Sequence, residues 1–246
     1  RPEFVFTLYA LQKLGAIAVP VGTREQGPGL AYIVNQCGAT GIVFDDDLAS
    51  RIPAPDAAAC LAWRLPVSAL AALDGPPVAA AATSEDDCAC ILYTSGTTGN
   101  PKGAMLTHLS IAHSSIHYEI AFKLTRADRA ALAVPATHVT GLVALITAMV
   151  HVAGTLVIVA EFKAASFVEL VARERITYSL MVPAMYQLCL LQPAFRTLDL
   201  SSWRVGGYGG APMPVPTVQA LALAVPELTL VNCYGSTETT SPATIM

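Results

Sequence analysis

Charged side chains are scarce in this sequence, and basic residues are fewer than acidic ones. Charged residues make up 13% of the 246 residues, and the formal net charge is −4. A protein that binds nucleic acid or an anionic membrane surface normally presents a basic patch, because phosphate groups dominate both surfaces. The charge balance gives no such patch and disfavours a nucleic-acid partner.

The sequence also lacks the cysteine patterns of metal and redox sites. Its six cysteines are scattered, except for Cys88 and Cys90, which are too close for a C-x-x-C pair. No second pair and no histidine cluster completes a zinc set. Reduced, buried thiols are typical of cytosolic proteins, and Arg1 to Glu3 open no signal-peptide pattern. We therefore expect a cytoplasmic protein.

Residues 139–160 contain no aspartate, glutamate, lysine or arginine. This stretch is long enough to span a membrane as a helix. Gly154 and Thr155 divide it, however, into a helix-like half, 141–152, and a β-branched half, 156–159. A buried helix followed by a buried strand explains both halves better, so we expect no membrane span.

Hydrophobic residues, by contrast, make up 54% of the chain, which favours strands covered on both faces. Helical spacing and short β-branched runs alternate along it, and residues 51–83, rich in alanine and proline, read as a surface connection. The pattern predicts an α/β fold of mostly parallel sheets flanked by helices, with ligands at the carboxyl ends of strands. The expected helices are 4–14, 29–36, 108–122, 164–174, one from 183, and 214–224; the expected strands are 16–19, 41–44, 91–93, 130–134, 156–159, 178–182, 203–205 and 229–233.

Residues 91–108 read ILYTSGTTGNPKGAMLTH and combine glycines, hydroxyls and one lysine after a short apolar run. Such a loop suits a phosphate group, because converging backbone N–H groups and hydroxyls donate hydrogen bonds while Lys102 supplies a positive charge. The Walker A spacing is not met, since Lys102 lies three residues past Gly99. A flexible linker has similar composition, but the strand-like entry and the single lysine after Pro101 argue against it.

The segment T-S-G-T-T-G-x-P-K-G at residues 94–103 resembles the signature loop of the adenylate-forming superfamily, which includes acyl-CoA synthetases, luciferases and the adenylation domains of peptide synthetases. The resemblance implies the core of that superfamily's large N-terminal domain, with this loop on the phosphates of ATP. The implied phosphate-binding residues are Thr94, Ser95, Gly96, Thr97, Thr98, Gly99 and Lys102.

A second motif, NCYGSTE at residues 232–238, follows an expected strand. Tyr234 can stack on a purine, Thr237 can hydrogen-bond a phosphate, and Glu238 can hold Mg²⁺, although a strand ending in a polar turn would look similar. It resembles the superfamily's Y-G-x-T-E motif, which implies adenine on Tyr234, the adenine amino group near Asn232, the α-phosphate at Thr237 and Mg²⁺ at Glu238. The implied nucleotide-binding residues here are Asn232, Cys233, Tyr234, Gly235, Ser236 and Thr237.

A third segment, Gly209-Gly210-Ala211-Pro212, resembles the superfamily's G-G-A-P segment beside the adenine. Small residues there let the backbone approach a flat ring closely, but a tight turn between a strand and a helix would look the same. The resemblance implies nucleotide binding by Gly210, Ala211 and Pro212. Tyr208 fills a position that is usually occupied by a smaller residue.

The fourth segment is Pro135 to Gly141, with His138 at its centre. A lone histidine in apolar sequence is more often a core residue. Many acyl-CoA synthetases, however, carry P-x-x-H here, and the resemblance implies that His138 gates the carboxylate site. Residues 139–144 contain no acid to hold an α-amine, which disfavours an amino-acid substrate. The expected acid-binding residues are His138, Val139, Thr140, Gly141 and Gly209, which permit aliphatic or aryl acids.

The resemblance implies an ATP-dependent, AMP-forming acid–CoA ligase in fatty acid or aryl acid metabolism. A carboxylate would attack the α-phosphate of ATP, and the acyl-adenylate would form a thioester with CoA. Two alternatives stay open: an adenylation domain that loads a carrier protein, and a non-catalytic nucleotide-binding homologue. The expected catalytic residues are Lys102, His138, Thr237 and Glu238.

Against the superfamily pattern, residues 1–246 read as one partial N-terminal domain, shortened at both ends and without the small C-terminal domain. The resemblance implies that the superfamily's ribose-binding aspartate and C-terminal catalytic lysine lie beyond Met246, so neither is assigned to a residue here. We therefore expect the chain to bind nucleotide weakly and not to complete the ligase cycle.

Overall fold

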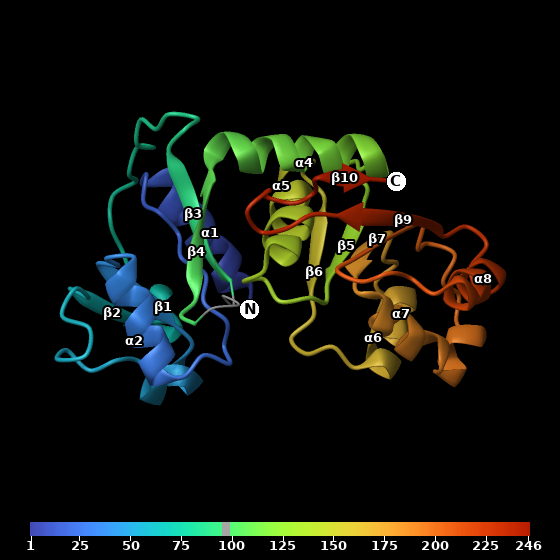
Figure 1. Cartoon of the computed structure of the whole chain (residues 1–246), viewed down its shortest axis with the longest axis horizontal. Coiled ribbons are helices and arrows are strands. Elements are labelled where there is room, and N and C mark those ends of the chain that lie inside the picture. Colours follow the sequence, from blue (N-terminus) through green and yellow to red (C-terminus); the bar gives the residue numbers. More distant parts are fainter. Residues whose placement is uncertain (95–98) are drawn as a thin grey trace. The chain divides into compact units, whose positions relative to one another are not determined.

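The computed structural model describes residues 1–94 and 99–246, which form two compact units, Arg1–Thr107 and His108–Met246 (Figure 1). The first unit carries the phosphate-loop motif, and the second carries the other three motifs. Each unit is described by itself below.

The first unit holds helices and two small pairs of strands. Strand β1 (Gly41–Phe44) pairs in parallel with β2 (Trp63–Pro66), and β3 (Cys88–Thr94) pairs antiparallel with β4 (Lys102–Thr107). The helices are α1 (Pro2–Lys13), α2 (Gly27–Gln36) and α3 (Val67–Leu70), with a 3₁₀ helix at Asp46–Arg51. A small core joins Leu30 and Val34 of α2 to Ala58 and Leu61.

The predicted helices at 4–14 and 29–36 and the predicted strand at 41–44 are confirmed. The predicted strand at 16–19 is wrong in extent, because only Ala18 pairs, in one bridge to Cys90. Strands β2 and β4 were not predicted. β2 lies in the segment rich in alanine and proline, and it is accommodated because Gly41 has no side chain: a Cβ there would lie 1.9 Å from the Trp63 ring.

The second unit is built on one six-stranded sheet in the order β10-β9-β8-β7-β5-β6. Its parallel strands are β5 (Arg129–Leu132), β6 (Thr155–Ile158), β7 (Tyr178–Met181), β8 (Val205–Gly209) and β9 (Thr229–Tyr234), and β10 (Thr244–Ile245) is antiparallel to β9. The helices are α4 (His108–Phe122), a π-helix at Thr140–Thr147, α5 (Ala148–His151), α6 (Ala164–Arg173), α7 (Pro183–Leu190), a 3₁₀ helix at Pro193–Arg196, and α8 (Val215–Ala224).

Helices cover both faces of this sheet, with α4 and α5 on one side and α6, α7 and α8 on the other (Figure 1). Strand β7 is buried throughout and alternates between the two layers. The Tyr178 ring lies edge-on to Phe122 of α4 with centroids 5.2 Å apart, whereas Met181 belongs to the cluster around Trp203. The prediction of a mostly parallel sheet flanked by helices is confirmed for this unit.

The uncharged stretch 139–160 forms the π-helix, α5 and β6 in succession, which confirms the expected helix followed by a strand. Its helical part is buried, and the hydroxyls of Ser115 and Thr147 satisfy each other there at 2.9 Å. Across residues 1–94 and 99–246, no helix has the length and apolar character needed to cross a membrane.

Candidate functional site

The phosphate-loop motif lies between the paired strands β3 and β4 of the first unit. Ser95, Gly96, Thr97 and Thr98 fall outside the described residues. Thr94 ends β3 and is paired with Lys102, the first residue of β4. The Thr94 hydroxyl donates a hydrogen bond to the Lys102 carbonyl oxygen at 3.4 Å. The two ends of the motif are thus held at adjacent positions by the strand pair.

Lys102 is exposed, and within the described part of the chain its ammonium group makes no ion pair or hydrogen bond. Its charge is therefore available to an anion. Gly99 has a φ of +137°, and a Cβ added to it would have no atom within 4 Å. Glycine is therefore needed there for its backbone conformation and not for lack of space. At Gly103 the limit is space, because a Cβ would lie 2.7 Å from the Ile91 side chain.

The three motifs of the second unit follow the carboxyl ends of parallel strands of one sheet. His138 comes after β5, residues 209–212 end β8, and residues 232–238 end β9. Strands β8 and β9 are neighbours, with Tyr208 opposite Asn232 and Gly209 opposite Cys233. The carboxyl edge of an open parallel sheet is where ligands bind in α/β proteins, so the topology agrees with the expected location of a site.

Gly209 is required by the close approach of β9. A Cβ on Gly209 would lie 2.4 Å from the Cys233 carbonyl oxygen, a distance that no side chain tolerates without movement of the backbone. Gly210 has φ +77°, which side chains disfavour. Ala211 and Pro212 are exposed at the turn that follows. Sterics alone therefore explain the glycines, and a flat ligand would meet small residues beyond them.

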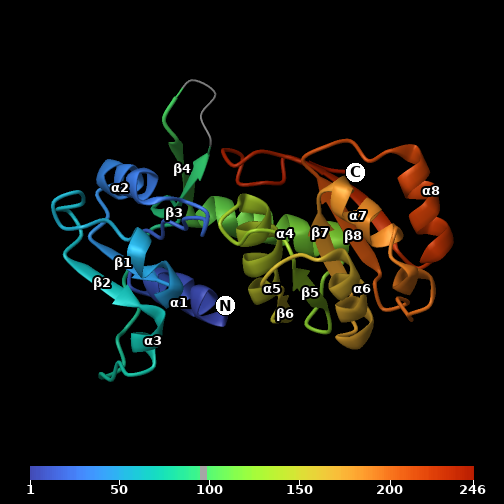
Figure 2. The same cartoon turned by 90° about the horizontal axis from the view of Figure 1, so that it is seen from below.

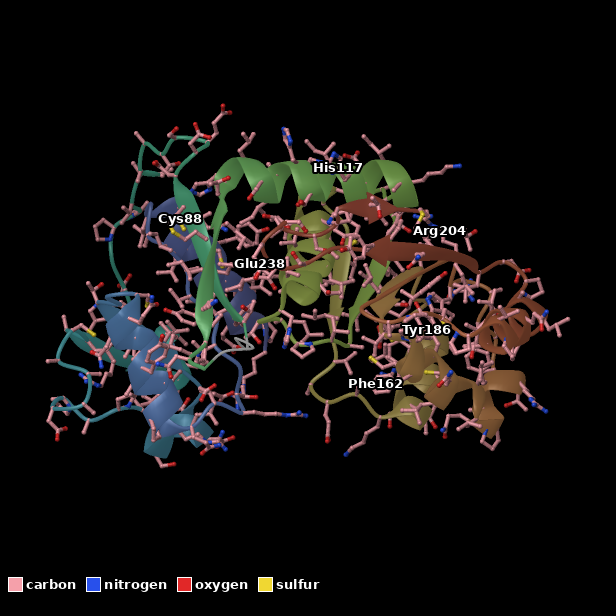
Figure 3. All side chains as sticks on the ribbon, in the orientation of Figure 1. Cys88, His117, Phe162, Tyr186, Arg204 and Glu238 are labelled. Atoms are coloured by element: carbon pink, nitrogen blue, oxygen red, sulfur yellow. The ribbon has the colours of Figure 1, made fainter. Side chains whose placement is uncertain are left out.

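Tyr234 and Glu238 present their side chains to solvent. Tyr234 is 68% exposed. Glu238, labelled in Figure 3, is also exposed and lies on the loop after β9. Within residues 1–94 and 99–246, Glu238 takes part in no ion pair or hydrogen bond. Thr237 is partly buried, and its carbonyl oxygen accepts a hydrogen bond from the Thr240 N–H at 3.0 Å. A ring, a hydroxyl and a carboxylate are thus available within one turn.

The turn is fastened to α4 by contacts that the sequence did not predict. The Thr240 hydroxyl lies 3.1 Å from the Ser110 hydroxyl, and the Ser241 hydroxyl lies 3.3 Å from that of Tyr118. Within the turn, the Ser236 N–H donates to the Thr239 hydroxyl at 3.0 Å. The partners on α4, Ser110 and Tyr118, lie 130 and 123 residues from Thr240 and Ser241 and belong to no motif, so no local signal marks them.

Asn232 and Cys233 contact neighbouring strands mainly through their backbone groups. Burial raises the pKa of the Cys233 thiol to about 12, so the thiol stays neutral and unreactive near neutral pH. The backbone N–H and carbonyl of Asn232 pair with Met246 at 2.8 and 2.9 Å. Gly235 is also confined, since a Cβ there would lie 3.0 Å from the Ser241 hydroxyl.

The acid-binding candidates differ in exposure. His138 is exposed. Its backbone N–H donates a hydrogen bond to the Pro135 carbonyl oxygen at 3.1 Å, and its backbone carbonyl oxygen accepts one from the Leu142 N–H at 2.8 Å. Val139 and Gly141 are buried, and Thr140 is partly buried. A Cβ on Gly141 would lie 2.2 Å from the Pro135 carbonyl oxygen, so this glycine is demanded by the turn itself.

The donor set suits Mg²⁺ better than a metal held by the protein alone. In the described ranges, no group of three or more histidine, cysteine, aspartate or glutamate residues could hold a metal ion. Mg²⁺ bound beside polyphosphate needs only one or two carboxylates, with phosphate and water completing its shell. The unpaired carboxylate of Glu238 fits that requirement.

An open groove of about 290 Å³ lies elsewhere on the second unit. It runs between α4 and the segment 242–245, where His117, Ile120, Pro242 and Ile245 are among its lining residues. None of the predicted site residues lines this groove.

Comparison with known proteins assigns the chain to a family along its whole length. The family described as AMP-binding enzyme matches residues 1–246. Feruloyl-CoA synthase from Amycolatopsis sp. is 33% identical over 238 residues, which is 97% of this chain and 48% of that protein. The long-chain-fatty-acid–CoA ligase FadD13 from Mycobacterium tuberculosis is 32% identical over 99% of this chain and 49% of its own length. The chain thus spans about half the length of the curated relatives it matches.

Solved structures agree with this assignment. The inhibitor-bound N-terminal domain of FACL13 from Mycobacterium tuberculosis matches with a TM-score of 0.90 and 29% identity, over 100% of this chain and 63% of that one. ATP-bound MatB from Rhodopseudomonas palustris matches with a TM-score of 0.87 and 25% identity, over 98% and 49% of the two chains. The α/β fold expected from the resemblance is confirmed, and the chain belongs to the AMP-binding enzyme family.

Proposed function

We propose that this chain is the nucleotide-binding part of an ATP-dependent, AMP-forming acid–CoA ligase. The observation that carries the proposal is the pair of unengaged charges on its two motifs, Lys102 at the start of β4 and Glu238 after β9, in the part of the chain that is described. A cation and a carboxylate left without protein partners are what a Mg²⁺–polyphosphate substrate requires.

The motif residues bind different parts of ATP. Lys102 and the loop from Thr94 to Gly99 bind phosphate oxygens, and the Tyr234 ring, 68% exposed, stacks on adenine. The small residues Gly210 to Pro212 leave room beside that ring, Asn232 contacts the adenine amino group, and Thr237 contacts the α-phosphate. When bound at Glu238, Mg²⁺ supplies charge neutralisation for the phosphates.

The protein's share of the chemistry is positioning and electrostatic stabilisation. A carboxylate oxygen attacks the α-phosphorus of ATP, the bond from phosphorus to the bridging oxygen breaks, and pyrophosphate leaves. Lys102 and Thr237 stabilise the negative charge that spreads over the phosphoryl oxygens. His138 stands at the entry of the acid site, where it orients the incoming carboxylate.

We propose an aliphatic or aryl carboxylic acid without a charged amine as the substrate. Residues 139–144 include no acidic side chain. The relatives named feruloyl-CoA synthase, long-chain-fatty-acid–CoA ligase and, at 30% identity, indoleacetate–CoA ligase from Aromatoleum aromaticum point to acids of this kind. CoA is the proposed acyl acceptor, and the proposed location is the cytoplasm.

The test is a screen of carboxylic acids for AMP formation by the protein that carries this chain at its full natural length. We expect AMP to appear only with ATP, Mg²⁺ and an acid, and to accumulate catalytically only with CoA. Catalytic turnover with an acyl carrier protein and not with CoA would replace the ligase by a carrier-loading enzyme. ATP binding without AMP formation for any acid would indicate a non-catalytic homologue.

A further inference from the structure

Helix α2 of the first unit makes contacts on two of its faces. Leu30 and Val34, one turn apart, pack into the small core with Ala58 and Leu61. The other side of the helix lies against the β3–β4 pair (Figure 2), where the Tyr93 hydroxyl donates to the Ile33 carbonyl at 3.5 Å and contacts the Gln36 side chain. The helix is thus a fixed support for the strand pair that carries Lys102.

One further contact reaches the lysine itself. The hydroxyl of Tyr32, on α2, donates a hydrogen bond to the Pro101 carbonyl oxygen at 3.3 Å, across 69 residues of sequence. The Pro101 carbonyl belongs to the peptide unit that precedes Lys102. The peptide unit that follows Lys102 is held by the Thr94 hydroxyl at 3.4 Å. Hydroxyl donors therefore hold both peptide planes that flank the Cα of Lys102.

Two planes fixed on either side of a Cα leave φ and ψ little freedom, and these angles set the direction of the side chain. Pro101 has no N–H and a fixed φ. Gly103 is closely packed, because a Cβ added to it would lie 2.7 Å from the Ile91 side chain and 3.3 Å from the Tyr93 ring. We infer that Tyr32 is a positioning residue for Lys102, which aims the ammonium group at a phosphate chain. This inference rests on the proposed function of Lys102 as a phosphate ligand.

The experiment measures the affinity of the 246-residue chain for MgATP and for AMP, by calorimetry, in four variants. Tyr32→Phe removes one hydroxyl and keeps the ring, Lys102→Ala removes the charge, and the double variant joins the two. Tyr9→Phe, on α1 of the same unit, is the matched control. AMP separates the roles, because it lacks the phosphates beyond the first.

We expect Tyr32→Phe to weaken MgATP binding about threefold to tenfold, the effect of one hydrogen bond, with AMP binding unchanged. In the Lys102→Ala background the same change should have no further effect, since there is no longer a charge to aim. The unfolding midpoint should stay close to that of Tyr9→Phe.

Three results overturn the inference. Equal losses for ATP and AMP, or an undiminished effect of Tyr32→Phe without Lys102, would show that Tyr32 only packs α2 against the strands. Wild-type affinity in Tyr32→Phe, with Lys102→Ala weakened, would remove the positioning role and leave the proposed function intact. If the wild-type chain binds no MgATP, or Lys102→Ala binds it equally well, the proposed function of Lys102 and the role of Tyr32 fail together.

Discussion

The guanidinium of Arg204 and the carboxylate of Asp128 form two parallel hydrogen bonds, Nε to Oδ1 at 2.9 Å and Nη2 to Oδ2 at 2.7 Å. Asp128 is only 3% exposed, and it also accepts hydrogen bonds from the Thr177 hydroxyl and the Thr125 N–H. Asp128, Thr177 and Arg204 immediately precede β5, β7 and β8. One buried carboxylate therefore joins the starts of three strands, at the edge opposite the motifs.

Replacing this carboxylate should cost stability in a pH-dependent way. Burial alone would raise the pKa of Asp128, but the bonds from Arg204 and Thr177 outweigh it and hold the pKa below its ordinary value. A lowered pKa stabilises the fold above the unfolded-state pKa of about 4, and this stabilisation is lost as pH falls through the folded-state pKa. Asp128→Asn should thus lower the free energy of unfolding by about 2 to 3 kcal/mol at pH 7, and by less at pH 3.

Urea unfolding of the wild type and Asp128→Asn at pH 7 and pH 3 measures this effect. The matched control is Asp199→Asn, which removes an exposed carboxylate paired with Arg175 and should leave stability unchanged. A deficit in Asp128→Asn that is the same at both pH values would show that the lost packing, and not the charge, matters.

Gly209→Ala should disturb the junction of β8 and β9. The new methyl group would stand 2.4 Å from the Cys233 carbonyl oxygen, so one strand must shift. We expect a loss of about 1 to 3 kcal/mol in the free energy of unfolding, as for other overpacked sites, together with weaker ATP binding. Gly75→Ala, with no atom within 4 Å of a built Cβ, is the control and should be neutral. Wild-type stability in Gly209→Ala would mean that the strands can part freely.

Tyr234 provides a test of adenine stacking that leaves the fold untouched. Because its side chain is 68% exposed, truncation removes little packing. Stacking of a base on an aromatic ring is worth about 1 to 3 kcal/mol, so Tyr234→Ala should weaken the binding of ATP and of adenosine alike by about fivefold or more. Tyr234→Phe keeps the ring and should retain affinity. Equal affinity in all three proteins would place adenine elsewhere.

The sequence predicted the second unit more completely than the first. Strands β5 and β7 are largely buried and β6 is wholly aliphatic after Thr155, so these strands appear as apolar runs in the sequence, and glycine or proline marks several strand ends. Strand β4 was missed because Lys102 and Gly103 look like part of a loop; its pairing with β3 is what makes it a strand. Strand β10 is two residues long and depends on its pairing with β9.

Those parts of the site that consist of short, contiguous motifs could be predicted from the sequence. The motifs around Lys102, His138, Gly209 and Tyr234 could be named from residue types and order. The residues that hold those motifs could not, because each acts across a long separation: Tyr32 on Pro101, and Ser110 on Thr240. Nothing in a local pattern distinguishes Tyr32 from any other tyrosine on a helix.

The most direct test of the account is the affinity of this chain for MgATP, measured by calorimetry in the wild type and in Lys102→Ala. The lysine charge is expected to contribute about as much as a hydrogen bond to an ionised group, so its removal should weaken binding about tenfold or more. Lys13→Ala, an exposed lysine of the same unit, should bind as the wild type does. Measurable MgATP binding that depends on Lys102 would support the adenylate-forming function. Absence of binding by the wild type, or full affinity in Lys102→Ala, would contradict it.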